Sequence, residues 1–229
     1  MSTSLSLERK LNPYTGSVVV KFEENLDTGK LESVTIKTDH LTLRPANSDD
    51  IEAYDAIFSD EENMKLYLGG KRSHEQTVQR LDMYATRWFG KGKYEGVPYP
   101  YSGFAVVYED QVIGNIALGN GDCKGEAQIG GAGNKRFYHL GLGKESATAI
   151  VRGYAPELLR RGYQVNLHEV DALGKSITGD IVYIKATASP KNVYSCNILE
   201  DVGFRIATYD KETDRFDYRI SMADIMGKA

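Results

Sequence analysis

The residues best suited to chemistry form one stretch, Gly130 to Val151, with the sequence GGAGNKRFYHLGLGKESATAIV. A strand is expected over Glu126–Gly133, and the Gly-x-Gly turn of Gly141–Gly143 separates it from a helical run. A strand, a glycine turn and a helix direct free backbone N–H groups and the positive end of a helix dipole at one place, which suits an anion such as a phosphate. Glycine allows the close approach that such binding needs. A glycine turn before an ordinary helix gives the same pattern, so both interpretations stay open here.

Length, composition and charge bound the class of protein. The chain has 229 residues, 41% of them hydrophobic and 26% charged, as in ordinary soluble proteins with one substantial core. No apolar stretch approaches the ~18 residues that span a bilayer, and the first residues lack a secretory signal, so no membrane association is expected. Cys123 and Cys196 provide neither a disulfide framework nor a zinc spacing, so we expect no metal and a cytoplasmic location. The formal net charge of -4 argues against nucleic acid as a partner.

The elements that position the glycine turn can be predicted from β-branched runs, caps and turns. Ser17–Glu23 and Leu31–Thr38 are expected to form a hairpin, and a strand at 41–44 follows it. Helical spacing begins after the N-cap candidates Asn47–Asp49, and a second helix opens with a capping box of Ser73 and Gln76.

The second half of the chain continues with hairpins and then alternates strands with helices. Pro156 predicts a kink or a restart of the central helix near Tyr154. Residues 163–180 are expected to be an inserted loop or an extra hairpin. The expected strands are Gly103–Tyr108, Val112–Leu118, Ile181–Ala188, Phe204–Tyr209 and Phe216–Met222. This order predicts an α/β protein of three α/β/α layers, with a mixed, mostly antiparallel sheet and an extra N-terminal hairpin.

Three stretches in this order resemble the GNAT superfamily of acetyl-CoA-dependent N-acetyltransferases, and most of all its Rim-type branch, which acetylates ribosomal-protein N-termini. LTLRPANSDDIEAY at 41–54 resembles the first strand and helix of the family. YHLGLG (Tyr138–Gly143) resembles its pyrophosphate loop, and ASPKNVYSCNILEDVGF (Ala188–Phe204) resembles the Rim-type pattern Asn-x-x-Ser followed by Leu-Glu-x-x-Gly-Phe. The resemblance implies a GNAT-like domain over 41–229, with an insertion near 163–180, and an N-terminal extension with a hairpin over 1–40.

The resemblance implies acetyl-CoA as the co-substrate. The backbone from Leu140 to Lys144 would hold the pyrophosphate, an N–H near Gly130 or Gly131 would polarise the thioester carbonyl, and Asn192 would contact the pantetheine arm. A solvated lysine and an N-cap are the alternative interpretations of Lys144 and Asn192. The expected cofactor-binding residues are Gly130, Gly131, Tyr138, His139, Leu140, Gly141, Leu142, Gly143, Lys144 and Asn192.

Two residues are expected to be catalytic. Ser195 matches the Rim-type serine by position and would protonate the departing thiolate, with Tyr194 as the neighbouring alternative. Glu126 is the candidate general base, because it lies on the same strand face as Gln128, and a water chain is the alternative. The chain departs from the family at Tyr138, where Arg or Gln is usual, and at Gln128, where many members have glutamate.

The acceptor is expected to be a primary amine, either the N-terminus of a protein or peptide or a small amine of the polyamine or aminoglycoside type. In the family the acceptor approaches over the first helices and the loop after them, and carboxylates with tyrosines there would suit an ammonium group. These residues are Asp60, Glu61, Glu62, Tyr94, Glu95, Tyr99 and Tyr101. A non-catalytic acyl-CoA-binding module on the same fold and an unrelated nucleotide-binding α/β protein remain as other classes. The protein is expected to be a monomer or a homodimer.

Overall fold

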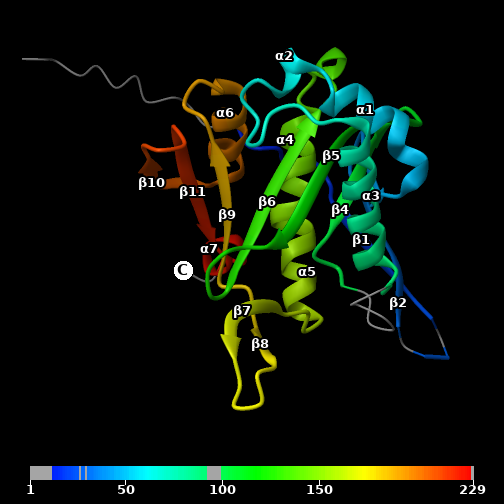
Figure 1. The fold of residues 1–229 in the computed structure, drawn as a ribbon, viewed down its shortest axis with the longest axis vertical. Coiled ribbons are helices and arrows are strands. Elements are labelled where there is room, and N and C mark those ends of the chain that lie inside the picture. The colour runs from blue at the N-terminus through cyan, green and yellow to red at the C-terminus, as the bar shows by residue number, and fades with distance from the viewer. Residues whose placement is uncertain (1–11, 26, 29, 92–98, 228–229) are drawn as a thin grey trace, which may run out of the picture.

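A computed structural model of the chain describes residues 12–25, 27–28, 30–91 and 99–227 (Figure 1). Its main feature is one nine-stranded sheet. From edge to edge the strands are β1 (Val19–Glu24), β2 (Leu31–Lys37), β3 (Thr42–Pro45), β4 (Gly103–Tyr108), β5 (Gln111–Asn120), β6 (Glu126–Gly133), β9 (Tyr183–Ala188), β11 (Arg215–Ser221) and β10 (Arg205–Asp210). All neighbours are antiparallel except β6 and β9, which are parallel. The prediction of a mixed, mostly antiparallel sheet is confirmed.

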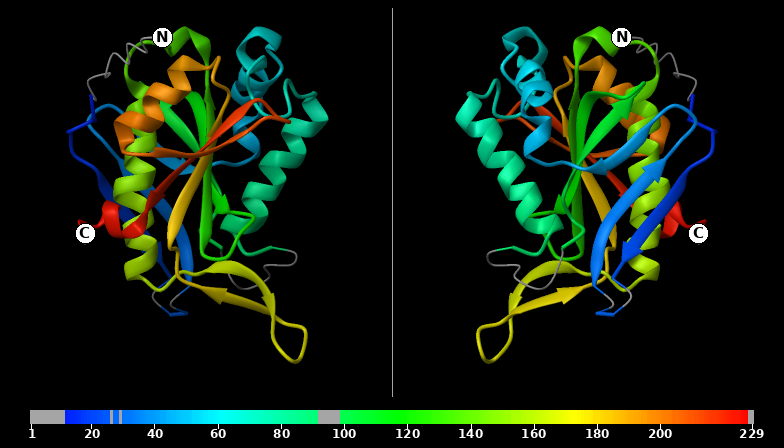
Figure 2. Two further views of the ribbon diagram at one scale, coloured as in Figure 1. Left: turned by 90° about the vertical axis from the view of Figure 1, so that its left-hand side faces the viewer. Right: turned by 90° about the vertical axis from the view of Figure 1, so that its right-hand side faces the viewer.

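Helices cover both faces of the sheet (Figure 2). One face carries η1 (Ser48–Asp50), α1 (Ile51–Phe58), α2 (Glu61–Met64) and α3 (His74–Trp88). The other face carries α4 (Leu142–Thr148), η4 (Ala149–Tyr154), α5 (Ala155–Arg160) and α6 (Val193–Val202). A short η3 (Lys135–Phe137) follows β6, and α7 (Met222–Ile225) follows β11. The predicted α/β/α layers are therefore confirmed.

Aromatic residues connect the layers through the middle of the sheet. The ring of Phe104 in β4 lies edge-on to Trp88 of α3, with centroids 4.9 Å apart, and edge-on to Tyr154 of η4, with centroids 5.0 Å apart. Trp88 also donates a hydrogen bond from Nε1 to the carbonyl of Gly103 at 2.7 Å. Each aromatic pair of this kind contributes about 0.5–1.5 kcal/mol beyond the area it buries, so β4 is fixed against both helical layers.

The N-terminal hairpin extends the same sheet at its edge. β2 pairs with β3 through Ile36 and Leu43. Beyond β2, the buried carboxylate of Glu145 in α4 accepts hydrogen bonds from Thr38 Oγ1 at 2.5 Å and from the backbone N–H of His40 at 2.9 Å. A buried carboxylate needs such partners, so these bonds tie the hairpin to the helix that follows the glycine turn.

The central helical run changes its winding at Pro156. Residues Ala149–Tyr154 form a π-helical turn, and α5 begins at Ala155 with Pro156 in its first turn. Proline has no N–H and its ring clashes with the carbonyl one turn earlier, and a wider π turn relieves that clash. The predicted kink or restart near Tyr154 takes the form of this change of winding, and the helical run continues through it.

Other differences from the sequence predictions lie in short segments. Residues 163–180 form the extra hairpin, β7 (Val165–Val170) and β8 (Ser176–Gly179), which is a separate two-stranded sheet. Pro45 belongs to β3, which therefore runs one residue beyond the expected strand at 41–44. α2 was not predicted, because a four-residue helix is too short to show a helical period.

Candidate active site

The two parallel strands separate at the centre of the sheet. The pairs between β6 and β9 are Glu126–Tyr183, Ala127–Ile184 and Gln128–Lys185. Both strands continue beyond these pairs, to Gly133 and Ala188, and they diverge as they do so (Figure 1). Backbone groups of β6 beyond Gln128 therefore lack a strand partner on the β9 side, where an inserted ligand could bond to them.

The glycine turn joins β6 to α4 beside this gap. His139 and Gly141 have left-handed backbone angles, with φ of 68° and 82°. Gly141 is the N-cap residue of α4, and no side chain caps that helix. A Cβ on Gly141 would meet no atom within 4 Å, while Leu140 is exposed and Leu142 is buried beneath the turn. Uncapped N–H groups under an open surface form a site for an anion.

Gly143 has a different role from Gly141, because it allows α4 to pack closely against α6. A Cβ at this position would lie 3.0 Å from Cδ1 of Ile198 and 3.4 Å from the hydroxyl of Tyr194. Glycine therefore allows the first turn of α6, which contains Ser195, to lie next to the glycine turn.

An aromatic pair supports the same turn from its other side. The ring of Tyr138 stacks on Tyr194 with centroids 5.6 Å apart and an angle of 28° between the planes. The Tyr138 hydroxyl donates to Oδ1 of Asn63 in α2, and Asn63 Nδ2 donates to the carbonyl of Gly133 at 3.1 Å. Burial raises the pKa of both tyrosines, so their hydroxyl groups stay protonated at neutral pH.

Lys144 and Asn192 already have partners within the chain. Lys144 Nζ donates to the carbonyl of Asn12 at 2.6 Å and lies 3.9 Å from the carboxylate of Asp201. Asn192 is the N-cap of α6, and its Oδ1 accepts from the N–H of Ser195 at 3.1 Å. Asn192 is therefore an N-cap through its side-chain oxygen. Lys144 is bound by groups of the protein and is not simply solvated.

Gly130 and Gly131 lie where β6 leaves β9. A Cβ on Gly131 would lie 2.6 Å from the carbonyl oxygen of Asn115, so this glycine keeps β5 close to β6. A Cβ on Gly130 would meet nothing within 4 Å. Asn115 pairs with Ala132 and its amide donates to the hydroxyl of Tyr54 in α1 at 3.0 Å. Side chains alternate along a strand, so the open surface over Gly130 faces the α1–α3 layer.

The two residues expected to be catalytic lie in different parts of the molecule. Ser195 is half-buried in the first turn of α6, next to the glycine turn. Glu126 is completely buried where β6 and β9 are still paired, and its Oε1 accepts from the N–H of Asp122 at 2.8 Å. Burial and the Glu126 carboxylate raise the pKa of the adjacent Tyr183 to about 12. Glu126 is therefore enclosed in a turn, and its assignment as the base stays a prediction.

A family model described as an acetyltransferase (GNAT) domain matches residues 40–205 of the chain. The protein belongs to the GNAT acetyltransferase family. The three stretches that suggested this family in the sequence now occupy the expected places in one GNAT fold, at β3 and α1, at the glycine turn and at α6. A search of curated proteins gave no match.

Solved GNAT structures share this fold at low sequence identity. A GNAT acetyltransferase from Bacillus anthracis is 21% identical with a TM-score of 0.60, covering 82% of this chain and 98% of its own. Ribosomal-protein-S5-alanine acetyltransferase from Vibrio fischeri is 15% identical with a TM-score of 0.61, over 83% and 97%. Aminoglycoside acetyltransferase AAC(6')-Ib in complex with coenzyme A is 14% identical with a TM-score of 0.56, over 82% and 98%. Within the described part of the chain, no helix is long and apolar enough to cross a membrane.

The acidic residues expected to attract an ammonium group in this GNAT protein are paired with lysines. The pairs are Asp60–Lys135, Glu61–Lys71 and Glu62–Lys65. Tyr101 is fully buried and donates to the carbonyl of Tyr163, and Tyr99 donates to Asn120 Oδ1 at 2.6 Å. Tyr94 and Glu95 lie outside the described residues. Among the described members of the set, Glu61 and Glu62 are thus exposed and paired with surface lysines, and the two tyrosines are bonded within the protein.

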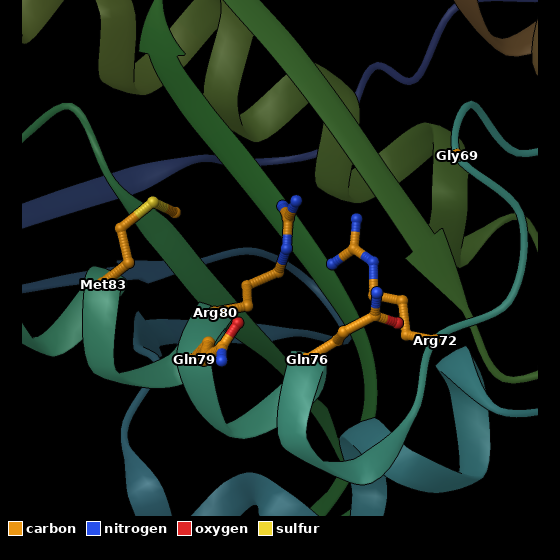
Figure 3. Close-up of a pocket in the computed structure, with 6 residues that line it drawn as sticks. All are labelled: Gly69, Arg72, Gln76, Gln79, Arg80 and Met83. Atoms are coloured by element: carbon orange, nitrogen blue, oxygen red, sulfur yellow. The ribbon is translucent and has the colours of Figure 1, made fainter.

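A pocket that sequence patterns did not indicate lies on the α1–α3 side of the GNAT sheet (Figure 3). Its volume is about 300 Å³, and it is lined by Gly69, Arg72, Gln76, Gln79, Arg80 and Met83. Arg72 precedes α3 and Arg80 lies within it, and both guanidinium groups extend toward the sheet (Figure 3). An arginine on an amphipathic helix is usually solvated, so nothing in the sequence distinguished these two.

Proposed function

We propose that this GNAT protein transfers the acetyl group of acetyl-CoA to a primary amine by direct attack within a ternary complex. One observation carries the proposal, namely the divergence of β6 and β9 beside an uncapped helix N-terminus. A gap in the sheet gives the thioester access to backbone donors of β6, and the helix N-terminus supplies an anion site at a fixed distance from that gap.

The residues of the glycine turn fit coenzyme A. The amides of Leu140–Lys144 are the proposed ligands of the pyrophosphate, with the open space over Gly141 admitting it. The backbone at Gly130 and Gly131 would polarise the thioester carbonyl. Asn192 Oδ1 is used by the cap of α6, so the amide NH₂ group is the part proposed to contact the pantetheine arm.

The proposed chemistry forms a C–N bond and breaks the C–S bond of the thioester. The amine nitrogen attacks the carbonyl carbon, the proton of the amine passes to water, and coenzyme A leaves as a thiolate that takes a proton. Ser195 is the proposed donor because it lies at the turn, and Tyr194 is the alternative because its hydroxyl lies beside the same turn. Glu126 is left out of this scheme because its carboxylate is enclosed away from the gap.

The proposed acceptor is the α-amino group of a protein or peptide. The Rim-type pattern around Ser195 supports it, as does the shared fold with a ribosomal-protein-S5-alanine acetyltransferase. A small amine is the second candidate, since an aminoglycoside acetyltransferase has the same fold. A non-catalytic acyl-CoA-binding module would bind the same ligand without turnover.

The test is turnover of acetyl-CoA by the purified protein, followed by release of the free thiol. Short peptides with free α-amino groups are compared with spermidine and an aminoglycoside, and mass spectrometry locates the acetyl group. Label on peptide α-amino groups is the expected result. Label only on polyamines or lysine side chains would show a different acceptor, and binding of acetyl-CoA without thiol release in any mixture would show a binding module.

A further inference from the structure

The arginine pocket of Figure 3 contains positive charge that the described protein does not neutralise. None of the ion pairs among the described residues includes Arg72 or Arg80. Nη1 of Arg72 is buried and has no hydrogen-bond partner in the part of the chain that the structure describes. By contrast, half-buried Arg44 pairs with Asp50, and half-buried Arg215 donates to the carbonyls of Leu66 and Thr187.

The existing contacts of both arginines are with aromatic groups. The Arg72 guanidinium lies over the rings of Phe58 and Tyr67, 4.8 and 5.6 Å from their centroids. Arg80 Nη1 donates to the hydroxyl of Tyr84 at 3.0 Å. Burial and the neighbouring charge of Arg80 lower the pKa of Arg72, whereas for Arg80 burial is outweighed by the contacts with Tyr84 and Tyr67, which raise its pKa. These contacts fix the two guanidinium groups in place and leave N–H donors unused.

A fixed guanidinium with unused donors matches the geometry of a carboxylate. Its planar fork donates two parallel hydrogen bonds to the two oxygens of one carboxylate, which Lys cannot do. Leaving a charge partly buried without a partner is costly, so an anion that enters the pocket is favoured over water. The local charge is positive although the whole chain has a formal net charge of -4.

The pocket also lies on the face from which an acceptor can reach the gap in the sheet. The Tyr84 hydroxyl, which accepts a hydrogen bond from Arg80, lies 3.5 Å from Oδ1 of Asn115. Asn115 in β5 is the strand partner of Ala132 in β6. The open surface over Gly130 is on this same face. The glycine turn and α4 occupy the opposite face, so a molecule held by the arginines would not compete with coenzyme A.

We infer that Arg72 and Arg80 bind a carboxylate of the acceptor, so that the acetylated amine belongs to a molecule with a negative charge near its amino group. The carboxylate is either the α-carboxylate of a free amino acid or an acidic side chain next to the N-terminus of a peptide. This inference rests on the proposed acetyl transfer and defines its substrate class. It excludes polyamines and aminoglycosides, which carry only positive charge.

The inference can be tested with matched acceptors that differ only in this negative charge. The peptides Ala-Asp-Ala-amide and Ala-Asn-Ala-amide test an acidic side chain, and alanine with alaninamide tests an α-carboxylate. In at least one pair, kcat/KM of the wild-type protein is expected to be about tenfold to a hundredfold higher for the acid, the range of a hydrogen bond to a charged group. The pair that shows the preference identifies the source of the carboxylate.

Variants connect that preference to the pocket. Arg72→Gln and Arg80→Gln are each expected to bring the acid-to-amide ratio of kcat/KM close to one, and Arg80→Lys to leave an intermediate ratio. Arg160→Gln, which removes an arginine of α5 on the opposite face, is the matched control and should keep the wild-type ratio. Arg72 packs on Phe58, so thermal melting checks each variant, and Arg80→Gln carries the test if Arg72→Gln does not fold.

Equal rates with acid and amide, or a preference that persists in both glutamine variants, would overturn the inference while leaving acetyl transfer intact. If no amine is acetylated, the proposed function fails, and calorimetry with both acid–amide pairs then decides on the pocket alone. Tighter binding of the acid than of its amide in either pair, lost in Arg80→Gln, would still support the carboxylate site. Equal binding of acid and amide within both pairs would refute it.

Discussion

Two substitutions at Gly141 separate charge from shape at the proposed pyrophosphate site. Gly141 has φ of 82°, and Asn and Asp are the residues other than glycine that best tolerate this region. A Cβ here meets no atom within 4 Å, so both side chains fit in the free protein. Gly141→Asn and Gly141→Asp therefore impose the same backbone strain and nearly the same volume, and only Gly141→Asp adds a negative charge.

The size of the effect follows from Coulomb's law. A carboxylate about 6 Å from a phosphate charge, at an effective dielectric constant of about 20, is repelled by about 3 kcal/mol. Gly141 is exposed, and screening by salt lowers this to about 1–2 kcal/mol. The Kd for coenzyme A is therefore expected to be about five- to thirtyfold weaker for Gly141→Asp than for Gly141→Asn.

Calorimetry of both variants with coenzyme A, at low and at high salt, measures this difference. The difference between their affinities should narrow as salt rises, because the repulsion is screened. Thermal melting is the control, and both variants should melt at the same temperature. Equal affinities at low salt would refute the assignment of the pyrophosphate to this turn, because a charge placed among its ligands could not be without effect.

Three further predictions address the chemistry and the packing. Ser195→Ala is expected to lower kcat by up to about 10²–10⁴-fold without changing the affinity for coenzyme A, and an unaltered rate would transfer the donor role to water or Tyr194. Gly143→Ala places a Cβ 3.0 Å from Cδ1 of Ile198, which opposes the helix preference for alanine, and Ile198→Val removes that atom, so the double variant should be more stable to urea than the sum of the single effects by about 0.5–1 kcal/mol. Additive effects in that double variant would contradict the explanation. Glu126→Gln keeps an oxygen that can accept from Asp122 and should leave kcat unchanged, whereas a loss of about 100-fold would reinstate Glu126 as the base.

The parts of the fold that could be predicted from the sequence are those determined by residues close together along the chain. The capping box of Ser73 and Gln76 opens α3 as predicted, since its hydrogen bonds join residues three apart on one turn. The bounds of β6 were also predicted correctly, because the turn residues that flank this strand are local signals. Period, cap and turn chemistry act within a few residues, so one sequence is enough to show them.

The rest of the candidate site depends on contacts between distant segments. The separation of β6 from β9 after Gln128 is a property of two strands and has no sequence signature of its own. Burial of Glu126 was missed because alternation assigns a strand residue to a face but does not tell whether a turn covers that face. Arg72 and Arg80 come together because one lies just before α3 and the other within it, and both side chains extend toward the same part of the sheet (Figure 3).

Tyr138 shows how a departure from the family pattern can be compensated by the fold. Where arginine or glutamine is usual, the Tyr138 ring stacks on Tyr194 of α6 and its hydroxyl donates to Asn63 of α2. The glycine turn is therefore held by protein contacts from both helical layers, and its anion site depends on backbone N–H groups. Because Asn63 also donates to the carbonyl of Gly133, one side chain connects α2, on the side of the sheet proposed for the acceptor, to the end of β6.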